Sequence, residues 1–346
     1  MRAVQVVERG LGLDGLALAD RPAPEPGPGE VLLEVAAVSA SRLDLLMVNG
    51  TTFGPDVVLP RTLGGDPAGR IAAVGPGVEP QRVGERVVVK PNIFCGTCAW
   101  CSSGREADCR AQTVLGLHRD GGAADLVVVP ARSAFVVPGG VSATTAAAAV
   151  HTVPVALHML RVAGGVEPGR VVVVTGAAGA VGSAAVQLVT ALGGRAVAVV
   201  QDSEQAAFVA GLAIAGVVRL DRESLADGVR RLVPAGADVA VDTTGVPDVL
   251  GACVDALAWG GHAVTCSGAP TAVAQVNLSD LYRLRRSLHG SAASDVADVR
   301  EALALVASGQ VRPQLGVVVP LAEYRAAYGA VLDPARNGKV VMEVNQ

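Results

Sequence analysis

The 346-residue chain is poor in aromatic residues, in charged residues and above all in lysine. Aromatic side chains make up 3% of it, so a surface on which nucleic-acid bases stack is not expected. Charged residues make up 17% and the net charge is -4, whereas binding to phosphate backbones needs clustered cations. We therefore expect no nucleic acid as a partner. Of the 28 basic residues only Lys90 and Lys339 are lysines, a bias that we attribute to a GC-rich genome and not to chemistry.

A targeting or membrane-spanning segment is also not evident. The first ten residues, MRAVQVVERG, are too short and too charged for a signal peptide. The uncharged run Val171–Gly194 is long enough to span a bilayer. It breaks after VVVVT into a glycine turn, however, so a buried strand followed by a helix explains it better. We expect a cytoplasmic protein with no membrane partner, and the length predicts two domains, each with its own core.

The pattern of apolar residues changes near Ser142. Before it, short strand-like segments are separated by turns: Val4–Val7, Val31–Val38, Arg70–Val74, Arg86–Val89 and Leu126–Val129. A helix over Ser142–Val162 follows, and then apolar strands alternate with helices: Arg170–Thr175, Ala180–Leu192, Arg195–Val200, Glu204–Ala210, Ala215–Leu220, Val239–Asp242 and His262–Cys266. The last part predicts helices Val296–Ser308 and Ala322–Leu332 and strands near Val317–Val319 and Lys339–Val344. Continuous apolar strands separated by helices indicate an α/β domain with a parallel sheet covered on both faces.

A glycine-rich turn follows the first of these apolar strands. In VVVVTGAAGAVGSAAVQL, Gly176, Gly179 and Gly182 stand between the strand and a helix. Such a turn brings backbone N–H groups and a helix N-terminus against a pyrophosphate, and glycine permits the close approach. A glycine-rich turn without a ligand is the alternative. The position at the first junction of a βαβ unit favours dinucleotide binding.

The end of the second strand bears on the choice between the two nicotinamide cofactors. NAD-selective sites usually place an acidic residue here, where this chain has Val200. Gln201 and Ser203, which follow it, have donors for a 2′-phosphate, and Arg219 at the next strand end could approach. Asp202 would repel that phosphate. We expect NADP(H), with NAD(H) as the alternative.

Four of the six cysteines are clustered with the spacing C-x2-C-x2-C-x7-C, at Cys95, Cys98, Cys101 and Cys109. Four thiolates on a glycine-containing loop can complete a tetrahedral shell around Zn²⁺ and leave no open position, so such a site is structural. Clustering of this kind in a chain of this size favours a metal over disulfides. We expect one structural zinc ion per subunit; an iron–sulfur cluster and free thiols are the alternatives.

These motifs and their order resemble the medium-chain dehydrogenase/reductase superfamily, which includes zinc alcohol dehydrogenases and quinone reductases. The resemblance rests on GEVLLEVAAVSASRLD, LGGDPAGRIAAVGPGV, the four-cysteine lobe, GGAADLVVVP, the glycine turn and NGKVVMEV. It implies a β-rich GroES-like substrate domain over residues 1–142 and 294–346, with a zinc lobe at 91–112. It also implies a Rossmann-type domain over 143–293 and an active site in the cleft between the two domains. The cofactor contacts that it implies are Gly176, Ala177, Ala178, Gly179, Ala180, Val181, Gly182, Gln201, Ser203, Arg219, Thr243, Thr244 and Gly268.

The catalytic zinc of that family does not carry over to this chain. Where a zinc-dependent member has Cys and His, this sequence has Ser41 and Gly65, and the third ligand position falls on His151. Asp66 stands where a Glu is usual, and Asp44 is kept. A rebuilt shell from His151, Asp66 and Asp44 is the alternative. For Asp66 we also weigh a pairing with an arginine, and for Asp44 a structural role at a helix start.

Without the metal, a conjugated substrate is the better expectation. Reducing a plain carbonyl leaves an alkoxide that needs a Lewis acid or a strong proton donor, whereas reducing an enone or quinone spreads the charge into an enolate. The candidate catalytic residues are His151 as general acid, Ser41 as hydrogen-bond partner of the carbonyl, and Asp66. The sequence thus predicts an NADP(H)-dependent reductase of a small conjugated carbonyl. An alcohol dehydrogenase or ketone reductase, and a cofactor-binding homologue without turnover, are the alternatives.

The sequence also predicts an assembly of identical subunits. We expect a homodimer or homotetramer, with edge pairing near Val317–Val319 or Ala263–Ser267. The loop Val48–Pro60 is expected to contribute to the wall of the substrate cleft.

Overall fold

The computed structural model describes residues 1–49, 57–269 and 271–345. The chain forms two compact units. The first unit contains Met1–His151, Asp295–Ala307 and Leu315–Gln346, and the second contains Thr152–Ser294 and Ser308–Gln314. The contacts therefore divide helix α3 (Ala143–Val162), whereas the boundary expected from the sequence lies at its start. Residues 50–56 of the loop Val48–Pro60 lie outside the described residues.

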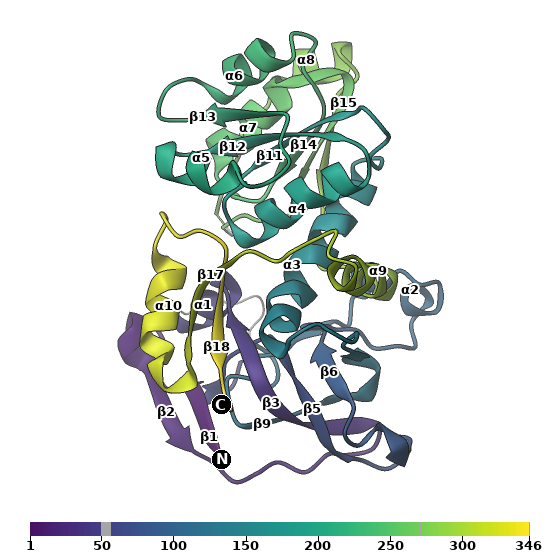
Figure 1. Cartoon of the computed structure of the whole chain (residues 1–346), viewed down its shortest axis with the longest axis vertical. Helices are drawn as coiled ribbons and strands as arrows, with labels where there is room; N and C mark the ends of the chain where they lie inside the picture. The colour runs from purple at the N-terminus through teal and green to yellow at the C-terminus, as the bar shows by residue number, and fades with distance from the viewer. Residues whose placement is uncertain (50–56, 270, 346) are drawn as a thin grey trace. The chain divides into compact units, whose positions relative to one another are not determined.

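The first unit is built on β-structure. Its main sheet has the order β10-β6-β5-β3-β18-β17, with β9 also paired to β3, so strands from both ends of the chain lie side by side (Figure 1). A three-stranded sheet, β2-β1-β4, and a small pair, β7-β8, complete it. The strands are β1 (Arg2–Val6), β2 (Leu16–Asp20), β3 (Glu30–Ala40), β4 (Arg61–Thr62), β5 (Asp66–Val74), β6 (Arg86–Val89), β7 (Asn92–Ile93), β8 (Thr113–Val114), β9 (Leu126–Pro130), β10 (Ala134–Val136), β17 (Leu315–Pro320) and β18 (Lys339–Glu343).

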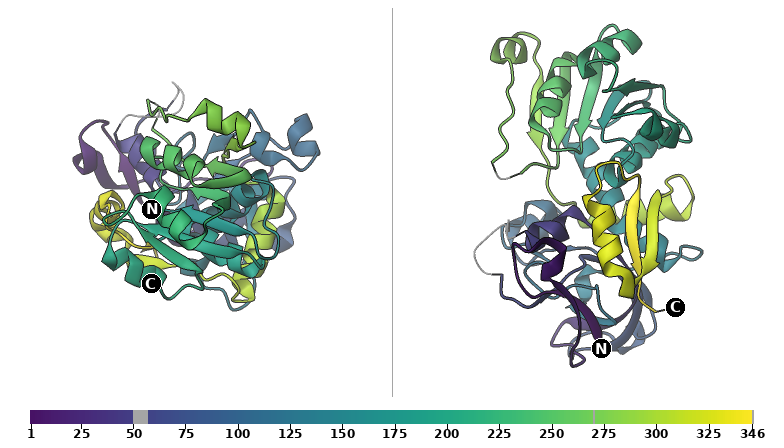
Figure 2. Two further views of the ribbon diagram at one scale, coloured as in Figure 1. Left: turned by 90° about the horizontal axis from the view of Figure 1, so that it is seen from above. Right: turned by 90° about the vertical axis from the view of Figure 1, so that its left-hand side faces the viewer.

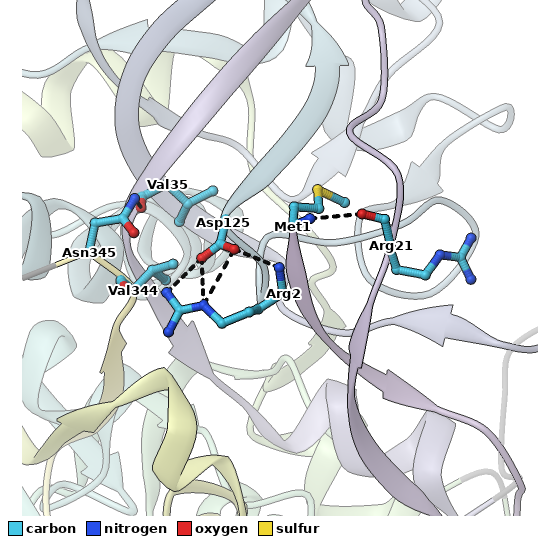
Figure 3. A network of polar contacts seen from close by, with 7 residues as sticks. All are labelled: Met1, Arg2, Arg21, Val35, Asp125, Val344 and Asn345. Carbon is cyan, nitrogen blue, oxygen red and sulfur yellow. Dashed lines mark hydrogen bonds and ion pairs between the residues drawn. The ribbon is translucent and has the colours of Figure 1, made fainter.

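Short helices accompany these strands. They are α1 (Arg42–Val48), α2 (Ala99–Ser102), α9 (Val296–Ala307) and α10 (Tyr324–Leu332). Helix α10 packs along β17 and β18 (Figure 2), and the fully buried Tyr328 on it joins the core of the β-sheets. Near the chain ends, Arg2 forms a 2.7 Å ion pair with Asp125 and also donates to the carbonyl of Val344 (Figure 3). These bonds tie the first strand to the C-terminal segment.

The second unit contains a parallel six-stranded sheet of order β13-β12-β11-β14-β15-β16. Every residue of β11 is buried, as expected for a strand with both faces covered. Helices α4 and α5 pack on β11–β13, and α6 and α7 pack on the strands from the opposite face (Figure 1). The elements are β11 (Val171–Thr175), α4 (Ala180–Ala191), β12 (Arg195–Val200), α5 (Ser203–Val209), β13 (Gly216–Arg219), α6 (Leu225–Leu232), β14 (Ala237–Asp242), α7 (Pro247–Asp255), β15 (Leu257–Thr265), α8 (Leu278–Arg283) and β16 (Ser287–Gly290).

This strand order confirms the expected α/β fold. The order of the strands reverses between β11 and β14, and doubly wound sheets bind nucleotides at such a switch point. One expectation about this sheet is wrong. The segment Ala263–Ser267 begins in β15, which is an interior strand paired on both sides, and the edge of the sheet is β16. Helix α3 is long and apolar enough to cross a membrane, but 72% of its most apolar window is buried within the protein, as in a core helix.

Candidate functional site

The three positions that the family resemblance aligns with catalytic zinc ligands come together in the first unit. Ser41 precedes α1, Gly65 precedes β5, and His151 lies on α3. They line one small pocket, together with Leu43, Asp44, Asp66 and the segment 115–117. The structure thus gathers Ser41, Asp66 and His151, the three candidate catalytic residues, around one space.

Asp44 has a structural function in this pocket. Its Oδ2 accepts a 2.8 Å hydrogen bond from the backbone N–H of Ser41, and the Ser41 side chain accepts from the backbone N–H of Asp44, which together form a capping box at the start of α1. The Ser41 hydroxyl also donates to Asp44 Oδ2 at 3.1 Å. Its Oδ1 accepts from the N–H of Gly64 at 3.0 Å. Burial raises the pKa of Asp44 to about 6 in spite of these bonds. Both oxygens therefore stabilise the loop that supplies the pocket wall.

Asp66 binds a lysine and not the arginine considered from the sequence. Its Oδ2 accepts from the Ser39 hydroxyl at 2.5 Å and from Lys339 Nζ at 3.1 Å. The three side chains come from β5, β3 and β18, which are neighbouring strands. Burial alone would raise the pKa of Asp66, but the charges of Lys339 and His151, with the hydrogen bond from Ser39, hold it below its usual value. The carboxylate is ionised at neutral pH.

His151 faces this carboxylate. Its Nδ1 lies 4.0 Å from Asp66 Oδ1, within ion-pair range but beyond a hydrogen bond. Burial lowers the pKa of His151, and the charges of Lys339 and Lys90 lower it further, while Asp66 opposes them. The imidazole is therefore mainly neutral at pH 7 and takes up its second proton at lower pH.

The donor set of this pocket does not fit a rebuilt zinc site. Ser41 and Gly65 supply neither nitrogen nor thiolate, and Asp66 Oδ2 already holds an ammonium and a hydroxyl. Both oxygens of Asp44 accept backbone hydrogen bonds. Of the expected ligands only His151 remains, whereas zinc needs about three from the protein. We therefore derive no step through a metal in this pocket.

The four-cysteine cluster does fit zinc. The ligand atoms of Cys95, Cys98, Cys101 and Cys109 lie within 4.8 Å of one another. The sulfurs of Cys95 and Cys98 are 3.8 and 3.5 Å from that of Cys101, close to the separation of about 3.8 Å that four Zn–S bonds of tetrahedral geometry impose. Cys95 Sγ also accepts from the N–H groups of Thr97 and Cys98, which hold its pKa near 6. These bonds favour the thiolate that a metal requires.

The glycine turn of the second unit leaves helix α4 open at its N-terminus. Gly176 has a φ of +61°, and a side chain there would meet Thr243 Oγ1 at 2.7 Å. A Cβ on Gly182 would lie 2.1 Å from the carbonyl oxygen of Gly176, so this residue must be glycine for the helix to approach the strand. Gly179 is the N-cap of α4 and no side chain caps the helix. The first N–H groups, from residues such as Ala180 and Val181, are available to an anion.

The sequence did not single out Asp242, which organises the strand ends beside this turn. Its buried carboxylate accepts hydrogen bonds from the hydroxyls of Thr175, Thr244 and Thr265 at 2.7–2.8 Å, joining the ends of β11, β14 and β15. Thr243, an expected cofactor contact, donates to the carbonyl of Thr175 at 2.9 Å. Gly268 is exposed in the segment after β15. An acidic residue ending an apolar strand and followed by two threonines was the available signal.

The end of β12 presents few charged groups. Asp202 caps α5, since its Oδ1 accepts from the N–H groups of Glu204 and Gln205. Gln201 and Ser203 are exposed. Arg219 is the register partner of Val200 on the neighbouring strand and forms a 2.7 Å ion pair with Asp221. The expected residues are thus brought near one another, with Arg219 the cation at this strand end.

Comparison with known proteins agrees with this architecture. Residues 27–139 match the alcohol dehydrogenase GroES-like domain, and residues 180–308 match the zinc-binding dehydrogenase family. The acryloyl-coenzyme A reductase of Metallosphaera sedula is 30% identical over 345 residues, 99% of both chains. The chain belongs to the medium-chain dehydrogenase/reductase superfamily. The acryloyl-coenzyme A reductase of Sulfurisphaera tokodaii is 28% identical over 340 residues, 95% of this chain and 96% of its relative.

A solved structure supports the same assignment over the whole length. The crystal structure of an NAD-dependent alcohol dehydrogenase superposes with a TM-score of 0.91 at 30% identity and covers 100% of both chains. As a member of this superfamily, the protein is an oxidoreductase that uses a nicotinamide dinucleotide, and its four-cysteine lobe is a structural zinc site.

Proposed function

We infer that the protein reduces the carbon–carbon double bond of a small conjugated carbonyl compound with NADPH and without catalytic zinc. The observation that carries this inference is the pocket around Asp66. Lys339 and Ser39 donate hydrogen bonds to its carboxylate, and Ser41 and Gly65 stand at positions where zinc ligands would be expected. A pocket of this composition has no Lewis acid for an alkoxide. The two relatives named acryloyl-coenzyme A reductase support an α,β-unsaturated acyl thioester as the substrate class.

The chemistry required of this chain is the control of one negative charge and one proton. When bound, the nicotinamide supplies the hydride to the β-carbon of the substrate. The charge then moves to the carbonyl oxygen, where the His151 ring, or the Ser41 hydroxyl once it turns from Asp44 Oδ2, donates a hydrogen bond. Protonated His151 delivers a proton to the α-carbon, which completes the saturated product and leaves a neutral imidazole. Because the pKa of His151 is lowered, the protonated ring is lost as the pH rises, and this step slows already at a pH below the ordinary histidine pKa of 6.5.

The residues at the end of β12 favour NADPH over NADH. Val200 stands where NAD-selective members place a carboxylate, and Asp202 is used in capping α5. Arg219 could turn from Asp221 to a 2′-phosphate, with Gln201 and Ser203 as further donors. Arg219→Ala should therefore raise the Kd for NADPH at least tenfold and leave the Kd for NADH nearly unchanged.

A substrate panel tests the function. The purified protein should oxidise NADPH with an unsaturated acyl thioester or an enone and show no activity on simple alcohols or ketones. His151→Ala should lower kcat by roughly 10²–10⁴-fold with little change in the Kd for NADPH. Near-normal turnover in that variant would reduce His151 to a packing residue.

Alcohol dehydrogenation is the second candidate, and the likeness to an NAD-dependent alcohol dehydrogenase favours it. It predicts NAD(P)⁺-dependent oxidation of alcohols and no activity on unsaturated thioesters. The same panel separates the two functions.

A further inference from the structure

The two lysines of the chain are both buried in the first unit. Lys90 is 1% exposed and Lys339 is 6% exposed, while all 26 other basic residues, 28 less two, are arginines. An ammonium is compact and satisfies single acceptor oxygens, whereas the planar guanidinium carries five donors that need several acceptors. A chain that uses arginine everywhere else thus keeps lysine where the space admits only a point charge.

Lys339 uses one oxygen of Asp66 and leaves the other to His151. Oδ2 accepts from Lys339 Nζ at 3.1 Å and from Ser39 Oγ at 2.5 Å. Oδ1 faces His151 Nδ1 at 4.0 Å. Ser39 lies directly opposite Asp66 in the register of β3 and β5, and β18 pairs with β3 on its other side. The sheet therefore fixes the direction in which the carboxylate faces the imidazole.

We propose that Lys339 is a positioning residue for His151 and acts through Asp66. An ionised carboxylate beside Nδ1 keeps a proton on that nitrogen, so the proton that the ring gains and loses is the one on Nε2. When the charged ring gives its Nε2 proton to the substrate carbon, the neutral Nδ1–H form remains. Lys339 is needed because a fully buried carboxylate without a cation tends to take up a proton itself. The tautomer of His151 is independent of the substrate. Only the transfer of the Nε2 proton to a substrate carbon rests on the proposed function.

The other charged groups near His151 provide a matched control. The charges that act on its ring are those of Asp66, Lys339 and Lys90. Lys90 is equally buried, but its ammonium donates to the carbonyl of Asn92 at 3.0 Å. A Lys90→Met substitution removes a buried positive charge and leaves the contacts of Asp66 intact.

Nitrogen NMR of the full-length protein tests the proposal without any substrate. The chain has five histidines, and the signals of His151 are those missing from His151→Ala. The parent protein should show the Nδ1–H tautomer of His151 at a pH where the ring is neutral. Lys339→Met should lose that preference, and Lys90→Met should keep it. An Nε2–H tautomer in the parent protein, or an Nδ1–H tautomer that persists in Lys339→Met, would overturn the proposal.

A kinetic cycle tests whether Lys339 and Asp66 act as one unit. Lys339→Met and Asp66→Asn should each lower kcat roughly 10–100-fold, the range for residues that orient a functional group. The double variant should be no slower than Asp66→Asn, and it carries no unpaired buried charge that would impair folding. Losses that multiply in the double variant would show that Lys339 acts independently of Asp66. If the parent protein has no activity on any conjugated substrate, the proposed function fails while the tautomer result stands.

Discussion

Asp44 and Asp66 are both buried in one pocket, but their pKa values are shifted in opposite directions. Asp44 is surrounded by N–H and hydroxyl donors, and burial raises its pKa to about 6. Asp66 has a lysine ammonium within 3.1 Å, and its pKa is lowered. The difference follows mainly from the charge of Lys339 beside Asp66, to which His151 and the hydrogen bond from Ser39 add.

Asp44→Asn should change the pH dependence of stability. The folded pKa of Asp44 lies above the unfolded value of 3.8, so its favourable contribution is complete below that value and is lost as the pH rises through about 6. Between pH 4 and pH 7 the parent protein should lose roughly 2 kcal/mol relative to Asp44→Asn. Urea unfolding at the two pH values measures this difference.

The chain offers a control for that measurement in α6. Ser224 and Asp227 form the same Ser-x-x-Asp arrangement at the start of a helix, but Asp227 is exposed. Asp227→Asn should give nearly the same stability difference from the parent at both pH values. A constant difference for Asp44→Asn as well would contradict the role of burial.

Single residues were predicted from the sequence where the partner is near in the chain. The structural role weighed for Asp44 at a helix start is confirmed by its hydrogen bonds to Ser41, three residues away. The partner of Asp66 was not predicted, because Lys339 is 273 residues away and reaches it through sheet pairing. A spacing rule describes local hydrogen bonds, and it has no means of finding the residue on a neighbouring strand.

At the scale of elements, the βα turn depends most on Gly182. Gly182→Ala would place a methyl group 2.1 Å from a backbone oxygen, so the strand and α4 must separate. We expect a loss of stability of about 1–3 kcal/mol and at least a tenfold rise in the Kd for NADPH. Gly179→Ala is the control, since its Cβ would be 3.2 Å from the same oxygen. Equal effects of the two substitutions would refute the steric argument.

The zinc lobe should be separable from cofactor binding. Cys98→Ser should lower zinc from one ion per subunit to well below one and reduce the melting temperature, because metal binding and folding of the lobe are coupled. The Kd for NADPH should change little. Cys266→Ser, outside the cluster, should retain one zinc ion by metal analysis. A second zinc ion in the parent protein would contradict the single site.

Strands with a continuous apolar sequence were predicted. Strands whose sequence has no such pattern, and which form because their backbone pairs with a neighbouring strand, were not. Strand β11 is buried throughout, and its sequence VVVVT indicates this directly. Strand β16, with the sequence SLHG, has alternating exposure and exists because its backbone pairs with β15. Helix α8 spans six residues and buries none of them, so its sequence carries little periodic signal. Helix α6 spans eight residues and buries Leu225, Gly228 and Val229 on one face, a helical spacing that was missed because the segment is short.

For the whole molecule we predict a homodimer that uses β16. This strand is a sheet edge, and large apolar side chains are exposed in its sequence neighbourhood: Trp259, Val273, Leu278, Tyr282 and Leu288. Light scattering should give twice the subunit mass of 34.7 kDa. Leu288→Pro, which removes a backbone donor from the edge, should shift the protein toward the monomer.

Strand β17, an edge of the main sheet in the first unit, supplies the comparison. Val318 is 42% exposed on it, and Val318→Arg should leave the dimer intact. Dissociation by Val318→Arg and not by Leu288→Pro would move the interface to β17. A parent protein with monomer mass at all concentrations would exclude both.

Burial of both lysines leaves the protein surface almost without primary amines. A succinimidyl ester should therefore leave Lys90 and Lys339 unmodified in the folded protein. Peptide mass spectrometry should find the dye on both lysines only after unfolding, so the reaction reports the opening of the first unit.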